Sequence, residues 1–186
     1  PATISDIDAL DAIETAVFPG DRISRRSFRT LIDRPTAETL VIEAGGEICG
    51  YAMILFRAGA ALARLYSLAV ATGEAGKGYG RALLAAAEKA AMDHDRILLR
   101  LEVREDNASA INLYKTTGYR NIGRVAEYYA DGMAALRFEK LLRGPEAPDV
   151  MTPFYEQTAD FTCGSACLLM ALDRFRSPNF LDPLWE

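Results

Sequence analysis

The sequence predicts an α+β domain with a mixed central β-sheet flanked by helices, followed by a C-terminal helical fragment. Some segments carry apolar residues at the spacing of an amphipathic helix, such as Ile7, Leu10 and Ile13. Others are short apolar runs bounded by glycine and charge, such as residues 40–42, which is typical of strands. Along residues 1–142 these segments follow the order ααβββαβαββ, which indicates a sheet covered by helices.

Boundary signals define each element in turn. Pro35 ends the second helix, Gly45 and Gly46 form a turn between the first two strands, and Gly118 ends the last helix. The expected helices cover residues 6–17, 24–33, 78–93 and 107–117. The expected strands cover residues 39–43, 48–56, 61–70, 97–104, 120–127 and 133–141.

Composition narrows the classes of function that fit. Of the 186 residues, half are apolar and a quarter are charged, and the net charge of −5 disfavours a dedicated nucleic-acid binder. No apolar run reaches the roughly 18 residues that indicate a membrane helix, and the N-terminus lacks the apolar core of a signal peptide. Three scattered cysteines indicate free thiols and no disulfide framework. The only histidine, His94, lies far in sequence from any pair of cysteines, which argues against a zinc site. We therefore expect a cytoplasmic protein that binds no nucleic acid, no membrane and no metal.

The most informative segment is a glycine-rich turn between a strand and a helix. The strand ends in Leu68, Ala69 and Val70. Such a turn exposes backbone N–H groups at the positive end of a helix, where a phosphate is favoured. The residues of the turn and of the helix start are Gly76, Lys77, Gly78, Tyr79, Gly80 and Arg81.

Two commoner phosphate motifs do not fit this turn. A P-loop needs Ser or Thr directly after its Gly-Lys pair, whereas here Gly78 follows Lys77. In a dinucleotide fingerprint the third glycine position would be that of Arg81. A glycine turn without a ligand remains the alternative.

A second informative segment joins a strand to a helix. Strand alternation places Glu102 on one face together with Arg100 and Arg104. Asn107 suits the N-cap of the next helix, and Tyr114 lies two turns further on. A carboxylate, an amide and a phenol are therefore expected to converge on one cleft, where the carboxylate could accept a proton from an amine and the phenol could donate one.

Both segments resemble the GNAT family of N-acetyltransferases. The turn is similar to the family's acetyl-CoA signature, Arg or Gln followed by x-x-G-x-G/A, at residues 75–80, although Ala75 departs from it. Residues 101–119 resemble L-E-V-R-x-x-N-x-x-A-x-x-L-Y-x-x-x-G-F/Y of the RimI-like branch, which comprises ribosomal-protein N-terminal acetyltransferases. A Tyr pair at Tyr128 and Tyr129 also fits that branch.

The resemblance implies a GNAT fold, acetyl-CoA as cofactor and roles for particular residues. Glu102 would be the general base and Tyr114 the general acid. Asn107 would contact the cofactor, together with residues 68–70 of the strand and residues 76–81 of the turn. The acceptor would be the N-terminal α-amino group of a peptide or protein.

The chemistry of amines favours the same acceptor. An α-amine has a pKa of about 8, so about a fifth of it is neutral at pH 7.4. A lysine amine, with a pKa of about 10.4, is only about 0.1% neutral at that pH. With lysine as the acceptor, the base would therefore have to compensate for a neutral fraction about two orders of magnitude smaller.

Simpler interpretations exist for each residue. Glu102 could be a strand residue paired with Arg100 or Arg104, Tyr114 a packing residue, and Asn107 only a helix cap. The domain as a whole could be a non-catalytic or weakly catalytic peptide-recognition module that serves an attached peptidase.

The C-terminal part resembles the start of another enzyme. A linker at residues 143–150 precedes residues 151–186, which resemble the N-terminal fragment of a papain-like cysteine peptidase of the double-glycine type. The resemblance implies that Gln157 is the oxyanion-hole residue and Cys163 the nucleophile. No histidine follows Cys163, so this fragment is expected to be inactive and to continue in a longer natural protein. Its apolar helix is expected to pack on the first domain or on a neighbouring molecule, which would allow self-association.

Overall fold

A computed structural model of the chain describes residues 1–18 and 20–142. The chain divides into two units, Pro1–Glu146 and Ala147–Glu186, and the first contains all the described residues. Within it, six strands form one mixed sheet in the order β1-β2-β3-β4-β6-β5. Over the ranges that the structure describes, no helix is long and apolar enough to cross a membrane.

The elements follow the expected order, and each boundary lies within two residues of the expected one. The helices are α1 (Ile7–Val17), α2 (Arg25–Ile32), α3 (Tyr79–Asp93) and α4 (Ala108–Thr116). The strands are β1 (Ala37–Ala44), β2 (Glu47–Phe56), β3 (Leu62–Val70), β4 (Leu98–Arg104), β5 (Arg120–Val125) and β6 (Ala135–Leu141). Short 3-10 turns occupy Ile4–Asp6 and Thr72–Glu74.

Local signals explain several of these boundaries. Gly45 and Gly46 both have positive φ, 62° and 86°, as a two-residue hairpin turn between β1 and β2 requires. The Ser24 side chain accepts a hydrogen bond from the Ser27 amide at 3.1 Å and so caps α2. Gly118, with a φ of 91°, follows the end of α4.

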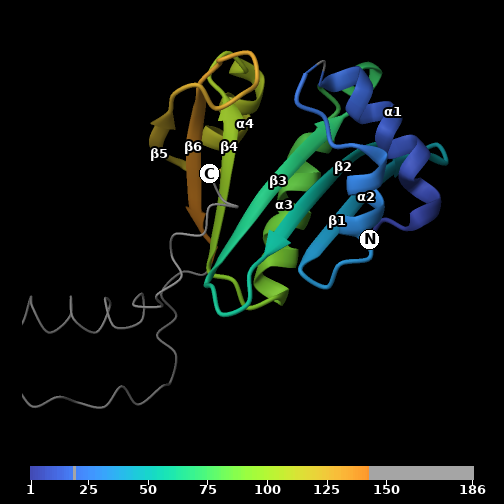
Figure 1. The fold of residues 1–186 in the computed structure, drawn as a ribbon, viewed down its shortest axis with the longest axis horizontal. Coiled ribbons are helices and arrows are strands. Elements are labelled where there is room, and N and C mark those ends of the chain that lie inside the picture. The colour runs from blue at the N-terminus through green and yellow to red at the C-terminus, as the bar shows by residue number, and fades with distance from the viewer. Residues whose placement is uncertain (19, 143–186) are drawn as a thin grey trace, which may run out of the picture. The chain divides into compact units, whose positions relative to one another are not determined.

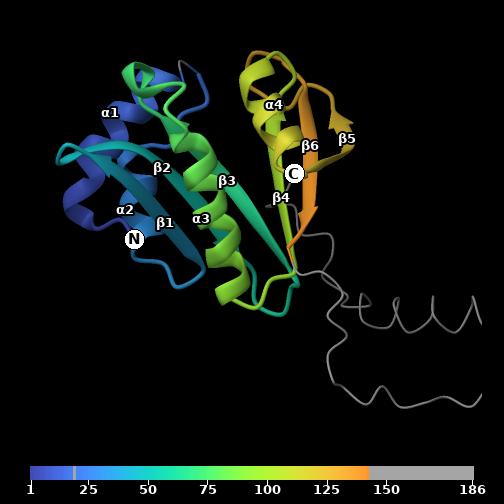
Figure 2. The same ribbon diagram turned by 180° about the vertical axis from the view of Figure 1, so that it is seen from behind.

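Helices cover both faces of the sheet (Figures 1 and 2). Helices α1 and α2 lie on one face, seen in front in Figure 1, and α3 and α4 lie on the other, seen in front in Figure 2. Each face has its own apolar core. The α3 side buries Leu65, Leu84, Leu99, Leu101, Tyr114 and Phe138, among others. The α1–α2 side buries Ile7, Leu10, Phe28, Tyr51, Met53 and Ala69, among others.

The two parallel strands at the centre of the sheet separate halfway along their length. Strands β3 and β4 pair from Leu62–Leu98 to Leu65–Leu101, and both strands continue beyond the last pair. They diverge in Figure 1 toward the ends that carry their last residues. We call this region, beyond the Leu65–Leu101 pair, the strand divergence.

A β-bulge lies at the start of the strand divergence. Met53 pairs with Ser67 and Ile54 with Leu65, so Tyr66 is an extra residue on β3. The bulge reverses the alternation of the strand: Leu65 before it and Leu68 after it both face the α3 core. Tyr66 itself is 47% exposed.

Candidate active site

The glycine-rich turn leaves backbone exposed at the start of α3. Gly76 and Gly78 have φ values of 80° and 87°, which favour glycine. A Cβ built on either residue would meet nothing within 4 Å, so the backbone borders open space. Helix α3 has 15 residues, no acidic residue in its first turn and no side-chain cap, which leaves its positive end available to an anion. The turn therefore fits the pyrophosphate of acetyl-CoA.

The charged side chains of the turn already have partners. Lys77 Nζ lies 2.9 Å from the Glu74 carboxylate, which offsets its charge and raises the pKa of Lys77. Arg81 Nη2 donates to Thr116 Oγ1 at 3.2 Å and so links α3 to α4. Binding of an anion here would depend mainly on backbone amides, and on Arg81 more than on Lys77.

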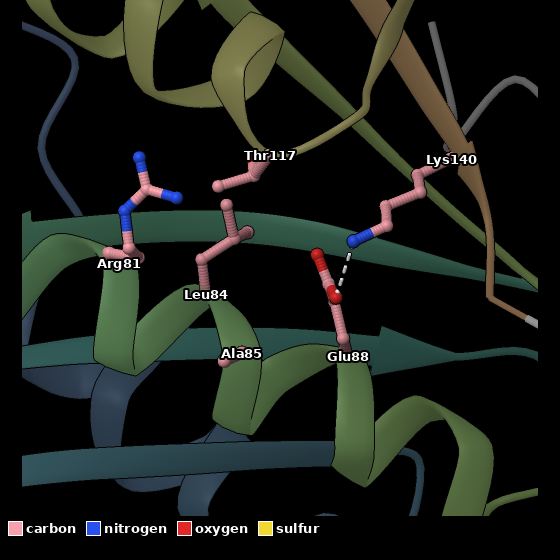
Figure 3. A pocket seen from close by; sticks show the side chains of 6 residues that line it. All are labelled: Arg81, Leu84, Ala85, Glu88, Thr117 and Lys140. Atoms are coloured by element: carbon pink, nitrogen blue, oxygen red, sulfur yellow. Dashed lines mark hydrogen bonds and ion pairs between the residues drawn. The ribbon is translucent and has the colours of Figure 1, made fainter.

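A hollow of about 270 Å³ extends along α3 from Arg81 (Figure 3). Lys140 Nζ and Glu88 Oε2 form an ion pair of 2.7 Å at its other end. The lining residues are Arg81, Leu84, Ala85, Glu88, Thr117 and Lys140. The one cation of this lining without an ion pair among the described residues, Arg81, lies at the end nearest the turn.

Strand β3 offers a second backbone contact. Leu68 and Val70 pack toward the α3 core, and Ala69 is buried toward α1. Beyond Leu65 the β3 edge that faces β4 has no ladder partner among the described strands, so an extended ligand could pair with it. A Cβ on Gly50 would lie 2.7 Å from the Ala69 carbonyl, so only glycine allows β2 to approach β3 here.

Glu102 is the first residue of β4 beyond its last pair with β3. Its side chain is only 6% exposed and lies between two arginines. Oε2 accepts a hydrogen bond from Arg64 Nε of β3 at 3.0 Å, and Arg64 Nη2 lies 2.9 Å from the same oxygen as an ion pair. Oε1 accepts from Arg137 Nε of β6 at 2.9 Å. With a single donor, Oε1 keeps room to accept another hydrogen bond.

The simpler interpretation, in which Glu102 pairs with Arg100 or Arg104 of its own strand, is wrong about the partners. Arg100 binds Glu139 at 2.6 Å, and Arg104 binds Asp106 and Asp131 at 3.1 and 2.9 Å. Cross-strand neighbours, not neighbours along β4, bind Glu102. Sequence reasoning missed Arg64 and Arg137, because nothing in a single strand shows which residue of another strand lies opposite.

Tyr114 lies on the other face of the sheet from Glu102. It is buried against Tyr119 and Phe138, with ring centroids 5.7 and 6.1 Å apart. Burial raises the pKa of its hydroxyl, which therefore stays protonated at neutral pH. The structure does not bring the carboxylate and the phenol together on one face, as the strand and helix periods suggested. They lie on opposite faces at the strand divergence.

A pair of tyrosines from the segment between β5 and β6 joins this group. Tyr128 Oη accepts from Arg64 Nη2 at 2.6 Å, and the Tyr129 ring lies 5.0 Å from the Tyr128 ring. Burial raises the pKa of Tyr129 to about 12. Tyr129 interacts electrostatically with both Glu102 and Tyr114, so it lies near each of them.

Asn107 caps α4, as its position suggested. Its Oδ1 accepts from the Ala110 amide at 3.0 Å, and the residue is exposed. The cap uses only the oxygen, so the two N–H donors of the side-chain amide remain for a ligand. His94, by contrast, stacks on Phe56 at 4.0 Å and lies 3.3 Å from Glu38, apart from the residues described above.

Comparison with known proteins gives a consistent result. The model of the acetyltransferase (GNAT) family matches residues 7–119, more than half of the chain. A putative ribosomal protein bS18-alanine N-acetyltransferase of Bacillus subtilis is 30% identical over 128 residues, which cover 69% of this chain and 83% of that protein. An N-alpha-acetyltransferase of Sulfurisphaera tokodaii is 30% identical over 142 residues, covering 70% and 84%.

Solved structures show the same fold. The ribosomal-protein-S18-alanine N-acetyltransferase of Escherichia coli superposes with a TM-score of 0.69 at 24% identity, covering 78% of this chain and 94% of that one. A second family model, a peptidase C39-like family, matches residues 152–186. Gln157 and Cys163 fall in this match, outside the described residues. Because its family model covers most of the described domain, this chain belongs to the acetyltransferase (GNAT) family and is an acetyl-CoA-dependent N-acetyltransferase.

Proposed function

We propose that the domain acetylates the N-terminal α-amino group of a peptide or protein, with Glu102 as general base and Tyr114 as general acid. The observation that carries this proposal is the position of the two groups on opposite faces of the sheet, at the point where β3 and β4 separate. One face would receive the acceptor, and the other, which carries the α3 turn, would hold the cofactor. The relatives named above, which are N-terminal acetyltransferases, support the same acceptor.

The chain's own residues account for holding the cofactor. Backbone amides of residues 76–81 would bind its pyrophosphate, and the β3 edge at residues 68–70 would pair with its pantetheine arm. The Asn107 amide would donate a further hydrogen bond. When bound, acetyl-CoA supplies an activated acetyl thioester.

Two proton transfers complete the reaction. As the amine nitrogen bonds to the acetyl carbon and the carbon–sulfur bond breaks, Glu102 accepts the proton that the amine loses, directly or through a water on Oε1. Tyr114 supplies a proton to the departing sulfur, and the raised pKa of its hydroxyl keeps that proton available. Arg64 and Arg137 hold the carboxylate in place, so they act as positioning residues.

Thiol release from acetyl-CoA tests the proposal. An unblocked peptide that begins with Ala or Ser should release thiol. The same peptide with a blocked N-terminus and one internal lysine should react at least tenfold more slowly, because a much smaller fraction of its amine is neutral. Equal rates would contradict the choice of the α-amine. The family match does not favour the non-catalytic peptide-recognition module.

We further infer that residues 1–142 form the acetyltransferase domain, that residues 143–150 are a linker, and that residues 151–186 begin a cysteine-peptidase-like domain with Cys163 and Gln157 in its site. The family match to residues 152–186 supports this organisation. A longer gene product with a histidine after Cys163 would strengthen it. The cytoplasmic location, the lack of nucleic-acid and membrane partners, and self-association through the tail belong to the same proposal.

A further inference from the structure

A groove between α2 and β3 lies on the α1–α2 side of the sheet, the side that also carries Glu102. Its volume is about 270 Å³. The lining residues are Arg26, Ser27, Thr30, Leu31 and Tyr66, and no carboxylate is among them. The groove is thus a mixed polar and apolar site whose one formal charge is positive.

Side-chain contacts connect this groove to the proposed base. Tyr66, the bulged residue of β3, forms one wall of the groove. The Arg64 guanidinium carbon lies 6.0 Å from the centre of the Tyr66 ring, and Arg64 Nε binds Glu102 at 3.0 Å. The Tyr66 ring therefore lies within about 10 Å of the Glu102 carboxylate, which about three residues of extended peptide can span.

The charges on this side of the sheet are unevenly distributed. Arg64 and Arg137 flank the single carboxylate of Glu102, so this cluster carries one net positive charge, and Arg26 adds another. Among the described residues, no carboxylate lies within ion-pair distance of Arg26. The neighbouring Arg25 is bound by Asp8 and Asp11, and this group carries one net negative charge. Water screens that charge, because the Asp8 side chain is 83% exposed.

The acidic residues near the site gather at the other end. Asp106 and Asp131 bind Arg104 at 3.1 and 2.9 Å. Asp21 accepts a hydrogen bond from the Ala130 amide at 3.2 Å, beside the tyrosine pair. An acceptor that crosses Glu102 therefore meets negative charge toward the segment between β5 and β6, and positive charge toward α2.

We propose that the α2–β3 groove binds an acidic side chain of the acceptor peptide, at about its second to fourth residue. Charge complementarity with Arg26 and Arg64 selects the carboxylate, and Tyr66 forms the wall beside it. This inference rests on the proposed function, because it assumes that the amine lies at Glu102.

Competition among matched peptides tests the groove. Three unblocked peptides begin with Ala and differ only at residue 3, which is Glu, Gln or Lys. We expect kcat/KM for the Glu peptide to exceed that for the Gln peptide by about three- to tenfold, and that for the Lys peptide by more. The Glu/Gln ratio should fall as salt is raised from about 0.05 to about 0.5 M, because screening weakens the attraction.

Substitutions in α2 assign the preference to the groove. Arg26→Gln should bring the Glu/Gln ratio to within about twofold of one, and Arg26→Glu should make the Lys peptide the better acceptor. The matched control is Arg29→Gln, an exposed arginine of the same helix that does not line the groove and should leave the ratio unchanged. Each ratio is measured on one enzyme preparation, so partial unfolding cancels.

The outcomes separate the two proposals. Equal kcat/KM values for all three peptides, or an Arg26→Gln ratio equal to that of the parent enzyme, would overturn the groove and leave α-amine acetylation intact. Failure to acetylate any of the peptides would overturn the proposed function, and the groove with it.

Discussion

The two halves of the active site are built in different ways. On the cofactor side, the contacts come from one continuous stretch, the end of β3, the glycine turn and the start of α3, and they depend mainly on backbone. On the acceptor side, Glu102 is held by side chains from β3 and β6, and the Tyr128 hydroxyl comes from a further segment. The cofactor side should therefore fail through changes in backbone, and the acceptor side through changes in single side chains.

The largest effect is expected on the acceptor side. Glu102→Gln keeps the shape and one acceptor oxygen but cannot take a proton, so kcat should fall by about 10²- to 10⁴-fold. Affinity for acetyl-CoA, measured by calorimetry, should change less than about twofold, because the cofactor contacts lie on the other face.

A matched variant separates chemistry from disturbance of the ion pairs. Glu139→Gln breaks the neighbouring cross-strand pair with Arg100 on the same face of the sheet, without removing any group that binds Glu102, and should leave kcat unchanged. A similar loss of kcat in both variants would refute the role given to Glu102.

Tyr114→Phe should have a smaller effect. The ring would still pack on Tyr119 and Phe138, and only the proton donor would be lost. We expect kcat to fall by about 10- to 100-fold in steady-state thiol release, less than for Glu102, because water could protonate the sulfur in part. Tyr119→Phe is the control, since Tyr119 is also buried with its hydroxyl in the core but is not a proposed acid. Loss of activity there, with Tyr114→Phe fully active, would exchange the two roles.

The difference between the halves also explains what the sequence could predict. The fold, the glycine turn, the cap at Asn107 and the alternation of β4 depend on residues close in sequence, so periodicity and turn chemistry predicted them. The partners of Glu102 depend on strand order, since β3 and β6 flank β4 although they are distant in sequence. Glu102 and Tyr114 lie on opposite faces because of the way α4 folds back over the sheet. The seven-residue spacing between Asn107 and Tyr114 does not determine how α4 folds back.

A change in the glycine turn should affect cofactor binding alone. Gly78→Ala forces a non-glycine residue into a φ of 87°, which costs about 1–2 kcal/mol. Relief of that strain would shift the turn, so the Kd for acetyl-CoA should rise by about three- to tenfold in calorimetry. The control is Gly73→Ala, in the same segment but without a positive φ or a nearby atom. Equal Kd values for both variants would mean that the turn does not need its left-handed backbone.

The smallest effect concerns the support beneath the acceptor side. Glu14 of α1 is buried, and its carboxylate accepts from the Ile23 amide at 2.7 Å and from the Tyr51 hydroxyl. Burial raises its pKa in the folded state, so its contribution to stability is fully present below the unfolded pKa, about 4.3, and is lost as pH rises through the folded value. Glu14→Gln cannot ionise, keeps an oxygen for Ile23 and can donate to Tyr51, whose hydroxyl then turns to Ser67 at 2.9 Å.

Urea unfolding at two pH values measures this effect. At pH 8 the Glu14→Gln variant should equal or exceed the parent in free energy of unfolding, by up to about 1 kcal/mol, and the advantage should vanish near pH 4.5. Glu105 should show the opposite pH dependence. Its hydrogen bond to Arg124 lowers its pKa, so its contribution to stability is lost as pH falls. A Glu14→Gln variant less stable than the parent at pH 8 would show that the charged carboxylate is well satisfied in its network.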